Sequence, residues 1–277
     1  MKLKKQQKQQ SQNRQELEEQ EKQIKRISFS ELKNWKECSY RHKLIYVDKL
    51  PYYSSNEYSI FGTAIHEACE SLSTGNIYSI FKKKFIEEIK SLALNGHKTN
   101  KKLVLEMVEQ AKPICDHVLP KMREHFGDFK IHAIEEPLLE EITEFDSYDK
   151  KFKGFIDLVL KTPDDKYHIV DWKTCSWGWS RDKKSDPIIN YQLTYYKNFF
   201  AKKHNITPKN IETYFVLLKR TAKKNVVEVV RTTSGPKKTS NALKVLENAV
   251  INIERETAIK NKLNCKYCKF YKTEHCT

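Results

Sequence analysis

The sequence predicts an α/β fold in which helices flank a mixed central β-sheet, with an N-terminal helical layer and a C-terminal cysteine clip. Two patterns predict this order: apolar residues recur at helical spacing up to about residue 126, and they alternate with period two from Ile131 onward. Cysteines then gather near the end of the chain. With 39% hydrophobic residues and only 7 Gly and 8 Pro among 277, the composition excludes collagen-like and low-complexity chains.

The first 26 residues are expected to stand outside the folded domain. They are rich in Gln, Lys and Glu, and their aliphatic residues are Leu3, Leu17 and Ile24. Such a segment buries too little apolar surface to offset the entropy of ordering, so we expect a disordered or solvated basic extension. Residues 27–277 are expected to form one domain, with a helical part at 27–126, a core at 127–235, and a helix and cysteine clip at 236–277.

Helices are expected in the first half of this domain. A hydroxyl at Ser28 or Ser30 can accept the free amide hydrogens of a first turn, which predicts a helix through Leu32 and Trp35. The segment from Gly62 to Ser73 carries apolar residues at i, i+3, i+4 and i+7, which predicts one buried helical face. This face consists of Ile65, Ala68, Cys69 and Leu72. Residues 77–126 continue a mostly helical pattern.

Strands are expected in the second half, where the period changes to two. The predicted strands are Ile131 to Leu139, Lys151 to Lys161, Lys166 to Lys173, Ile211 to Leu218 and Val226 to Thr232. Helical spacing returns from Ile188 to Lys203 and from Ser240 to Lys260. The first of these helices separates two strands, and the second leads into the terminal cysteines.

The charge of the chain is strongly positive and uneven. Lys and Arg number 51 against 36 Asp and Glu, a net charge of +15, and residues 202–277 contribute 17 basic and 6 acidic residues of these. A field of this sign attracts nucleic acid, although a solvated surface is an equal explanation of charge alone. There is no apolar run of about 18 residues and no signal-peptide pattern, so we expect an intracellular, cytoplasmic protein (host-cell cytoplasm if viral) with no membrane partner.

Two acids stand inside otherwise apolar strands. Asp157 lies in GFIDLVL and Asp171 in YHIVDWKT, where a carboxylate is costly unless a cation or hydrogen-bond donor holds it. Because strand side chains alternate, Asp171 and Lys173 share one face and Trp172 points to the other. Paired carboxylates suit Mg²⁺, and Lys173 is then placed to orient or deprotonate water for phosphodiester hydrolysis. A buried Asp171 and Lys173 ion pair with a purely structural role is the alternative.

The order of motifs along the chain is more specific than any one of them. SFSELKNWKECSYRHKLIYV begins at Ser28 and is followed by short motifs in a fixed order. These are GTAIH with His66, Glu136, GFID with Asp157, DWK with Asp171 and Lys173, and QLTYY with Gln192 and Tyr196. This order resembles the RecB-like branch of the PD-(D/E)XK nuclease superfamily, and the resemblance extends from Ser28 to Cys276. It implies a restriction-endonuclease-like core at 127–235 that is the catalytic part.

The resemblance also implies the roles of individual residues. His66, Asp157, Asp171 and the backbone carbonyl of Trp172 would bind Mg²⁺ or Mn²⁺, and Lys173 would be catalytic. Glu136, or its neighbour Glu135, would be the strand glutamate of the site. Gln192 and Tyr196, which share one side of a helix at i and i+4, would line the site and touch substrate phosphate.

The terminal cysteines have the spacing of a metal site. Cys265 and Cys268 form CKYC, Cys276 follows, and Cys38 is the natural fourth ligand. Ligand type alone does not separate zinc from iron and sulfur, and His275 is an alternative zinc ligand to Cys276. The pattern resembles that of the AddB subunit and the CRISPR-associated exonucleases, which implies a [4Fe–4S] cluster that staples the two ends, with structural Zn²⁺ as the alternative.

The function that the resemblance implies is a metal-dependent deoxyribonuclease. We expect an exonuclease on single-stranded or resected DNA ends in recombination, repair or replication. Residues expected to contact DNA are Trp177, Trp179, Arg181, Lys219 and Arg220. The alternatives are a non-cleaving nucleic-acid-binding or assembly subunit and a structure-specific endonuclease. The chain has no helicase P-loop, so a motor or recombination protein would be a separate partner.

Overall fold

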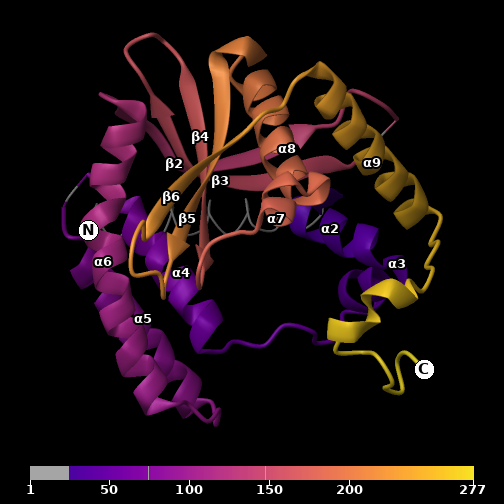
Figure 1. Cartoon of the computed structure of the whole chain (residues 1–277). Helices are drawn as coiled ribbons and strands as arrows, with labels where there is room; N and C mark the ends of the chain where they lie inside the picture. The colour runs from indigo at the N-terminus through magenta and orange to yellow at the C-terminus, as the bar shows by residue number, and fades with distance from the viewer. Residues whose placement is uncertain (1–24, 74, 147) are drawn as a thin grey trace, which may run out of the picture. The chain divides into compact units, whose positions relative to one another are not determined.

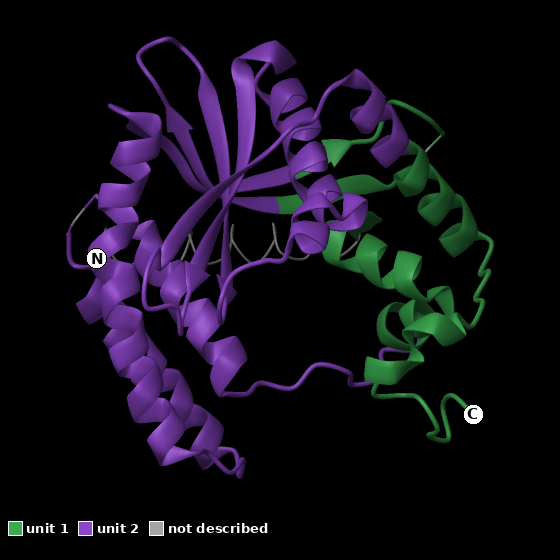
Figure 2. Cartoon of the chain, viewed as in Figure 1, with its two compact units in different colours: residues 1–47, 139–154, 244–277 green, residues 48–138, 155–243 purple. Residues whose placement is uncertain are grey.

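The computed structural model describes residues 25–73, 75–146 and 148–277, and most of the predicted extension at 1–26 lies outside them. By its contacts the chain divides into two compact units, which Figure 2 distinguishes by colour. Unit 1 comprises residues 1–47, 139–154 and 244–277, and unit 2 comprises 48–138 and 155–243. The units interleave along the chain, and a single domain at 27–277 stays a prediction.

The fold is a mixed sheet flanked by helices, as the sequence predicts (Figure 1). The strand order is β1-β3-β4-β5-β6, with β2 also paired to β3. The strands are β1 (Arg26–Ser28), β2 (Lys130–Glu141), β3 (Lys151–Lys161), β4 (Tyr167–Cys175), β5 (Ile211–Lys219) and β6 (Val227–Thr232). Every predicted strand is present, and β3 has the predicted bounds.

Parallel pairing in the centre of the sheet requires a crossover between β4 and β5. That crossover contains α7 (Arg181–Ser185), α8 (Pro187–Lys203) and η2 (Pro208–Asn210). Strand β4 is antiparallel to β3, and β5 is antiparallel to β6. The carboxylate of Asp186 accepts hydrogen bonds from the first amides of α8, which fixes where this helix begins.

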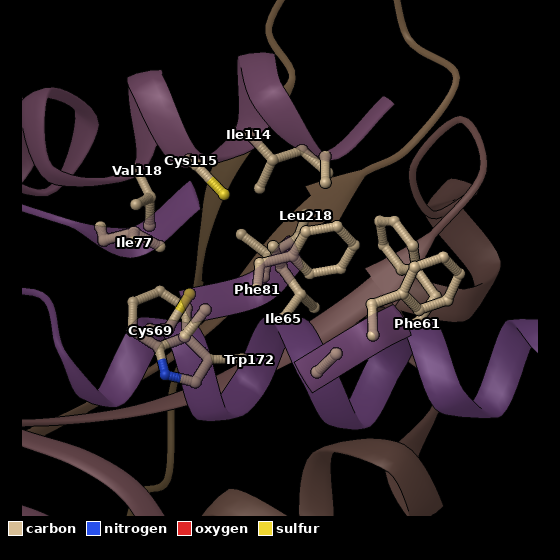
Figure 3. Close-up of a cluster of buried hydrophobic side chains, with 14 of the residues drawn as sticks. Phe61, Ile65, Cys69, Ile77, Phe81, Ile114, Cys115, Val118, Trp172 and Leu218 are labelled. Carbon is tan, nitrogen blue, oxygen red and sulfur yellow. The ribbon is translucent and has the colours of Figure 1, made fainter. Parts of the chain in front are cut away.

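Three helices of unit 2 cover one face of the sheet. They are α4 (Glu57–Glu70), α5 (Ile77–Leu94) and α6 (Lys101–Phe126). The predicted buried face of α4 is confirmed, since Ile65, Ala68 and Cys69 are at most 1% exposed. The helix starts before Gly62 because Asn56 forms a capping box with Ser59. Figure 3 shows side chains of these helices gathered with Trp172 and Leu218 of the sheet in one core.

Unit 1 brings the N-terminal and C-terminal segments together. It contains α2 (Phe29–Glu37), α3 (Ser39–His42), the π-helix η1 (Lys43–Val47), the second half of α9 (Pro236–Glu254) and η3 (Lys262–Tyr267). Of the two candidate caps, Ser28 is the one that accepts the amide hydrogen of Glu31. The side chains of Asn261 and Asn264 both donate to the carbonyl of Glu37, at 2.9 and 2.6 Å. These bonds fix the cysteine-bearing segment beside the end of α2.

Candidate active site

The centre of the candidate site is the pair Asp171 and Lys173 on β4. Asp171 is 2% exposed, and its Oδ2 lies 2.6 Å from Nζ of Lys173. The predicted sharing of one face is therefore confirmed. Trp172, between them, points to the other face and is buried in the core shown in Figure 3.

Asp157 on β3 lies beside this pair because of the strand register. Leu158 is paired with Val170, so continuing the antiparallel register by one residue sets Asp157 opposite Asp171 on the same face. The backbone N–H of Trp172 donates to Oδ2 of Asp157 at 2.7 Å. Burial and the nearby charge of Asp171 raise the pKa of Asp157 well above its usual range. Two carboxylates are thus held together in a site that favours a compensating cation.

His66 on α4 approaches the acids from the helical side. Its Nδ1 lies 3.7 Å from Oδ2 of Asp157. Burial lowers the pKa of His66 to about 4, although the charge of Asp171 acts in the opposite direction. The imidazole is therefore neutral at pH 7, which is the form that can bind a metal ion.

Gln192 and Tyr196 of α8 complete the site on the sheet face of Asp171. Nε2 of Gln192 donates to Oδ1 of Asp171 at 2.7 Å and to the hydroxyl of Tyr196 at 3.1 Å. Burial and the charge of Asp171 raise the pKa of Tyr196, so its hydroxyl stays protonated. The predicted pairing on one side of the helix is confirmed, and the structure adds the direct bond to Asp171.

The two neighbouring glutamates of β2 have different surroundings. Glu136 accepts hydrogen bonds from Nζ of Lys203 at 2.7 Å and Nε2 of His204 at 2.8 Å, both at the end of α8. Burial acts to raise the pKa of Glu136, but these bonds outweigh it and the pKa is lowered. For Glu135, burial and the charge of Asp171 both raise the pKa. Glu135, rather than Glu136, is therefore the glutamate that interacts electrostatically with the two acids.

Adjacent residues of a strand point to opposite faces, which accounts for the different surroundings of Glu135 and Glu136 in β2. Glu135 has a φ of 49°, in the left-handed region that non-glycine residues rarely adopt. A left-handed residue disturbs the regular strand geometry locally. Lys203 also donates to the carbonyl of Pro137 at 2.6 Å, so this lysine binds both the side chain of Glu136 and the backbone of Pro137.

The residues expected to contact DNA lie around the loop after β4. Trp177 is 72% exposed and Arg181 is exposed, whereas the ring of Trp179 packs 5.1 Å from Phe215. Backbone bonds from residues 220 and 221 to residues 175 and 176 hold this loop on the hairpin of β5 and β6.

Two of those expected contacts are already engaged inside the protein. Lys219 is 7% exposed and is paired with Glu228 at 3.2 Å. Arg220 donates to Gln110 at 2.6 Å and lies over the ring of Tyr58. Lys219 therefore has little surface to offer to a phosphate, while Trp177 and Arg181 remain accessible.

The donor set of the acidic site suits a hard cation. Within the described residues no group of three or more His, Cys, Asp and Glu is arranged to hold a metal ion as it stands. The acid oxygens instead contact Lys173, Gln192 and the amide of Trp172. Oδ2 of Asp171 is buried and accepts no hydrogen bond from any described residue. Its polar contact is the ion pair with Lys173. Oxygen donors beside a neutral imidazole are the ligand types that Mg²⁺ and Mn²⁺ accept.

The four cysteines predicted to bind a metal lie together in unit 1. Cys38, Cys265, Cys268 and Cys276 line one cavity of about 300 Å³, and none of them forms a disulfide. Burial raises the pKa of Cys276, and the other three thiols add to this rise while Lys260 opposes it. The grouping predicted from the sequence is present, although the sulfur atoms do not form a metal-holding group as they stand. Cys69 and Cys115 are core residues instead, at 1% and 7% exposed.

Comparison with known proteins identifies the family. The chain matches the PD-(D/E)XK nuclease superfamily over residues 26–273. A crystal structure from Eubacterium rectale, described as a candidate exonuclease, is similar with a TM-score of 0.56 and 11% identity, over 90% of this chain and 88% of that one. The crystal structure of SSO0001 is similar with a TM-score of 0.42 and 14% identity, over 93% and 90%.

No curated protein matches the sequence. No helix within the described part of the chain is long and apolar enough to cross a membrane. Because the superfamily match spans nearly all of the 277 residues and the fold agrees with it, the chain belongs to the PD-(D/E)XK nuclease superfamily.

Proposed function

We propose that the protein is a Mg²⁺- or Mn²⁺-dependent deoxyribonuclease that acts as an exonuclease on single-stranded or resected DNA ends, in recombination, repair or replication. Membership of a nuclease superfamily supports hydrolysis of phosphodiester bonds. The observation that carries the proposal is the joint placement of Asp157, Asp171 and Lys173 on one face of two paired strands. The similar fold of the Eubacterium rectale protein, described as a candidate exonuclease, supports the exonuclease part.

The metal ion would be held by His66, Asp157, Asp171 and the backbone carbonyl of Trp172. When bound, it polarises the phosphodiester and lowers the pKa of a bound water. Neutral His66 offers a ring nitrogen without competition from a proton. Gln192 fixes the orientation of Asp171 through Oδ1, which leaves Oδ2 directed toward Lys173. The carboxylate of Glu135 interacts electrostatically with Asp171 and Asp157, and we assign to Glu135 the role first expected for Glu136.

Lys173 is the residue proposed to act on the attacking water. Its amine lies between the buried carboxylate of Asp171 and the ring of Phe215, 5.7 Å from the ring centre. The ammonium group can orient water toward a phosphate and stabilise negative charge that develops on the phosphate oxygens. Trp177 and Arg181 are proposed to contact the DNA strand beside the site, because both are exposed.

Degradation of end-labelled DNA tests the proposal. Oligonucleotides labelled at the 5′ or 3′ end, single-stranded or duplex, are incubated with Mg²⁺ or Mn²⁺ and either wild-type protein or Lys173→Ala. Release of label from one end by the wild type alone supports an exonuclease and gives its polarity. Internal cuts at junctions favour a structure-specific endonuclease. Binding without cleavage, also when a helicase is added, favours a non-cleaving subunit and overturns the proposal.

We also propose that Cys38, Cys265, Cys268 and Cys276 hold a [4Fe–4S] cluster, with Zn²⁺ as the alternative. Their common cavity and mutual electrostatic influence support a shared ligand. Four thiolates are chemically suited to either metal centre. Absorption near 400 nm and iron and sulfide content after anaerobic purification distinguish the two, because zinc gives neither.

A further inference from the structure

Beside the cysteines, unit 1 carries a surface on which lysines lie over tyrosine rings. Nζ of Lys260 is 5.0 Å from the ring centre of Tyr40, and Nζ of Lys266 is 5.2 Å from that of Tyr267. Lys272 lies in the same way over Tyr271, at 5.4 Å. We call these six residues the Lys-Tyr surface. Each lysine covers one face of its ring by a cation–π contact, which leaves the other face for a different planar group.

Two of the three rings of this surface, those of Tyr267 and Tyr271, are strongly exposed. Tyr267 is 82% exposed and Tyr271 is 45% exposed, and the three lysines are exposed as well. A tyrosine this exposed contributes little to the core of its own protein. The four cysteines line their cavity and are only partly exposed. Tyr40, Lys260, Tyr271 and Lys272 border the same cavity, whereas Lys266 and Tyr267 do not line it. Lys266 and Tyr267 are therefore the pair that stands apart from the proposed metal-binding group.

The backbone that carries the Lys-Tyr surface is held by local hydrogen bonds. The amide of Tyr271 donates to the carbonyl of Cys268, and the amide of Lys272 donates to that of Cys276 at 2.9 Å. Thr273 and Cys276 form an isolated bridge. The hydroxyl of Tyr40 donates to the carbonyl of His275 at 3.1 Å. A partner that binds here loses little entropy in ordering the backbone, because local hydrogen bonds already hold it.

The charge of the segment indicates the kind of partner. Residues 255–277 contain six Lys or Arg and two Glu, so a polyanion is attracted. Alternating cations and exposed aromatic rings are the combination that binds single-stranded nucleic acid, in which phosphates contact lysines and bases stack on rings. A duplex hides the faces of its bases, and an acidic protein has no regular series of planar groups.

We propose that the Lys-Tyr surface is a second binding site for single-stranded nucleic acid, separate from the acidic site in unit 2. Bases stack on Tyr267 and Tyr271, and phosphates contact Lys266 and Lys272. This site retains a strand whether or not the acidic site cleaves it, so the inference does not depend on the proposed nuclease activity.

The test is binding of a fluorescent dT oligonucleotide of about 30 nucleotides to the full chain, with Lys173→Ala as background so that no cleavage occurs. Tyr267→Ala should weaken binding about tenfold, which is the effect of one lost stacking contact. Tyr267→Phe keeps the ring and should bind as the background protein does. Tyr148→Ala, which removes a tyrosine of unit 1 that is 39% exposed, is the matched control and should also leave affinity unchanged.

Two further measurements separate stacking from charge. An abasic oligonucleotide of equal length should bind Tyr267→Ala and the background protein equally, because it has no bases to stack. Lys266→Gln should reduce the salt dependence of binding by about one phosphate contact. Unchanged dT affinity in Tyr267→Ala, or an equal loss on the abasic strand, overturns the proposal. Each of these measurements reads binding and not cleavage. The second-site proposal can therefore hold even if the wild-type protein cleaves no DNA, and it can fail even if the protein does cleave DNA.

Discussion

Gln192 donates a hydrogen bond from Nε2 to Oδ1 of Asp171 at 2.7 Å, and this bond joins α8 to the acid at the centre of the candidate site. Oδ2 of the same carboxylate faces Lys173 at 2.6 Å. The carboxylate is 2% exposed, so water does not replace a lost partner easily. The orientation of the Asp171 carboxylate therefore depends on one neutral donor, Gln192, and one cation, Lys173.

Gln192→Leu should lower the rate of DNA cleavage about 10- to 100-fold, the usual effect of losing a residue that orients a metal ligand. The measurement is kcat and KM with Mg²⁺ and a labelled single strand. We expect kcat to fall and KM to change little, since Asp171 is proposed to hold the metal ion rather than to bind substrate. Tyr191→Phe, which alters the same helix at a hydroxyl away from Asp171, is the control. An equal loss in both variants would show a general effect on α8.

Glu135 and Glu136 should respond differently to the same substitution. Glu135→Gln should reduce cleavage with an unchanged melting temperature, because Glu135 interacts electrostatically with Asp171 and forms no ion pair within the described residues. Glu136→Gln should lower the free energy of unfolding by about 1 kcal/mol, because it weakens the bonds from Lys203 and His204. Chemical denaturation and cleavage assays of both variants check this. Loss of activity confined to Glu136→Gln would contradict the assignment.

How far the sequence predicts this site depends on the kind of residue. Asp171, Lys173 and the pair Gln192 and Tyr196 follow from regular strand and helix periods, which fix the face of each side chain. The choice between Glu135 and Glu136 depends on which face of β2 is turned toward Lys203 and His204, and local sequence carries no signal for those tertiary partners.

The ends of the strands are also predicted from the sequence only where local signals mark them. The bounds of β3 are predicted because polar turn residues stand on both sides of its alternating pattern. Strand β5 continues to Lys219, one residue past the predicted end, and Lys219 is buried in an ion pair with Glu228. The sequence alone predicts an exposed cation at Lys219, because its partner Glu228 lies on a different strand. Such tertiary pairing is outside the reach of local patterns.

His168 should make stability depend on pH. It lies on β4 among aromatic rings, 5.0 Å from Phe126 and 5.8 Å from Tyr214. Burial lowers the pKa of His168 below its ordinary value of 6.5, although the charge of Glu212 acts in the opposite direction. The unfolded chain therefore binds the proton first. The stability that neutral His168 contributes is complete above about pH 6.5 and is lost as pH falls through the lowered folded-state pKa.

Urea unfolding of the wild type and His168→Gln from about pH 8 to about pH 5 measures this contribution. Glutamine can still bond to Thr162, which contacts Nε2 of His168 at 3.0 Å, but it does not titrate. We expect the stability of the wild type to fall more steeply with acid than that of the variant. Other buried histidines are present in both proteins and cancel. Parallel curves would show that His168 does not titrate between these limits.

Cys268→Ser should lower the melting temperature and the metal content together. The proposed metal centre links Cys38 near the start of unit 1 to Cys265, Cys268 and Cys276 at its end, so removing one ligand loosens this connection. Elemental analysis and thermal unfolding of anaerobically purified protein are the measurements. Cys175→Ser, at a partly exposed cysteine outside this group, should change neither. An unchanged melting temperature in metal-free Cys268→Ser would rule out a stabilising clip.

The central claim is that Asp157 and Asp171 bind the metal ion and that Lys173 acts in catalysis at the same site. The most direct test is Mn²⁺ binding measured beside cleavage of a labelled single strand, for wild type, Asp157→Asn and Lys173→Met. The account predicts that Lys173→Met binds Mn²⁺ and DNA but does not cleave, whereas Asp157→Asn loses both Mn²⁺ binding and cleavage. Wild-type cleavage rates in either variant would contradict it.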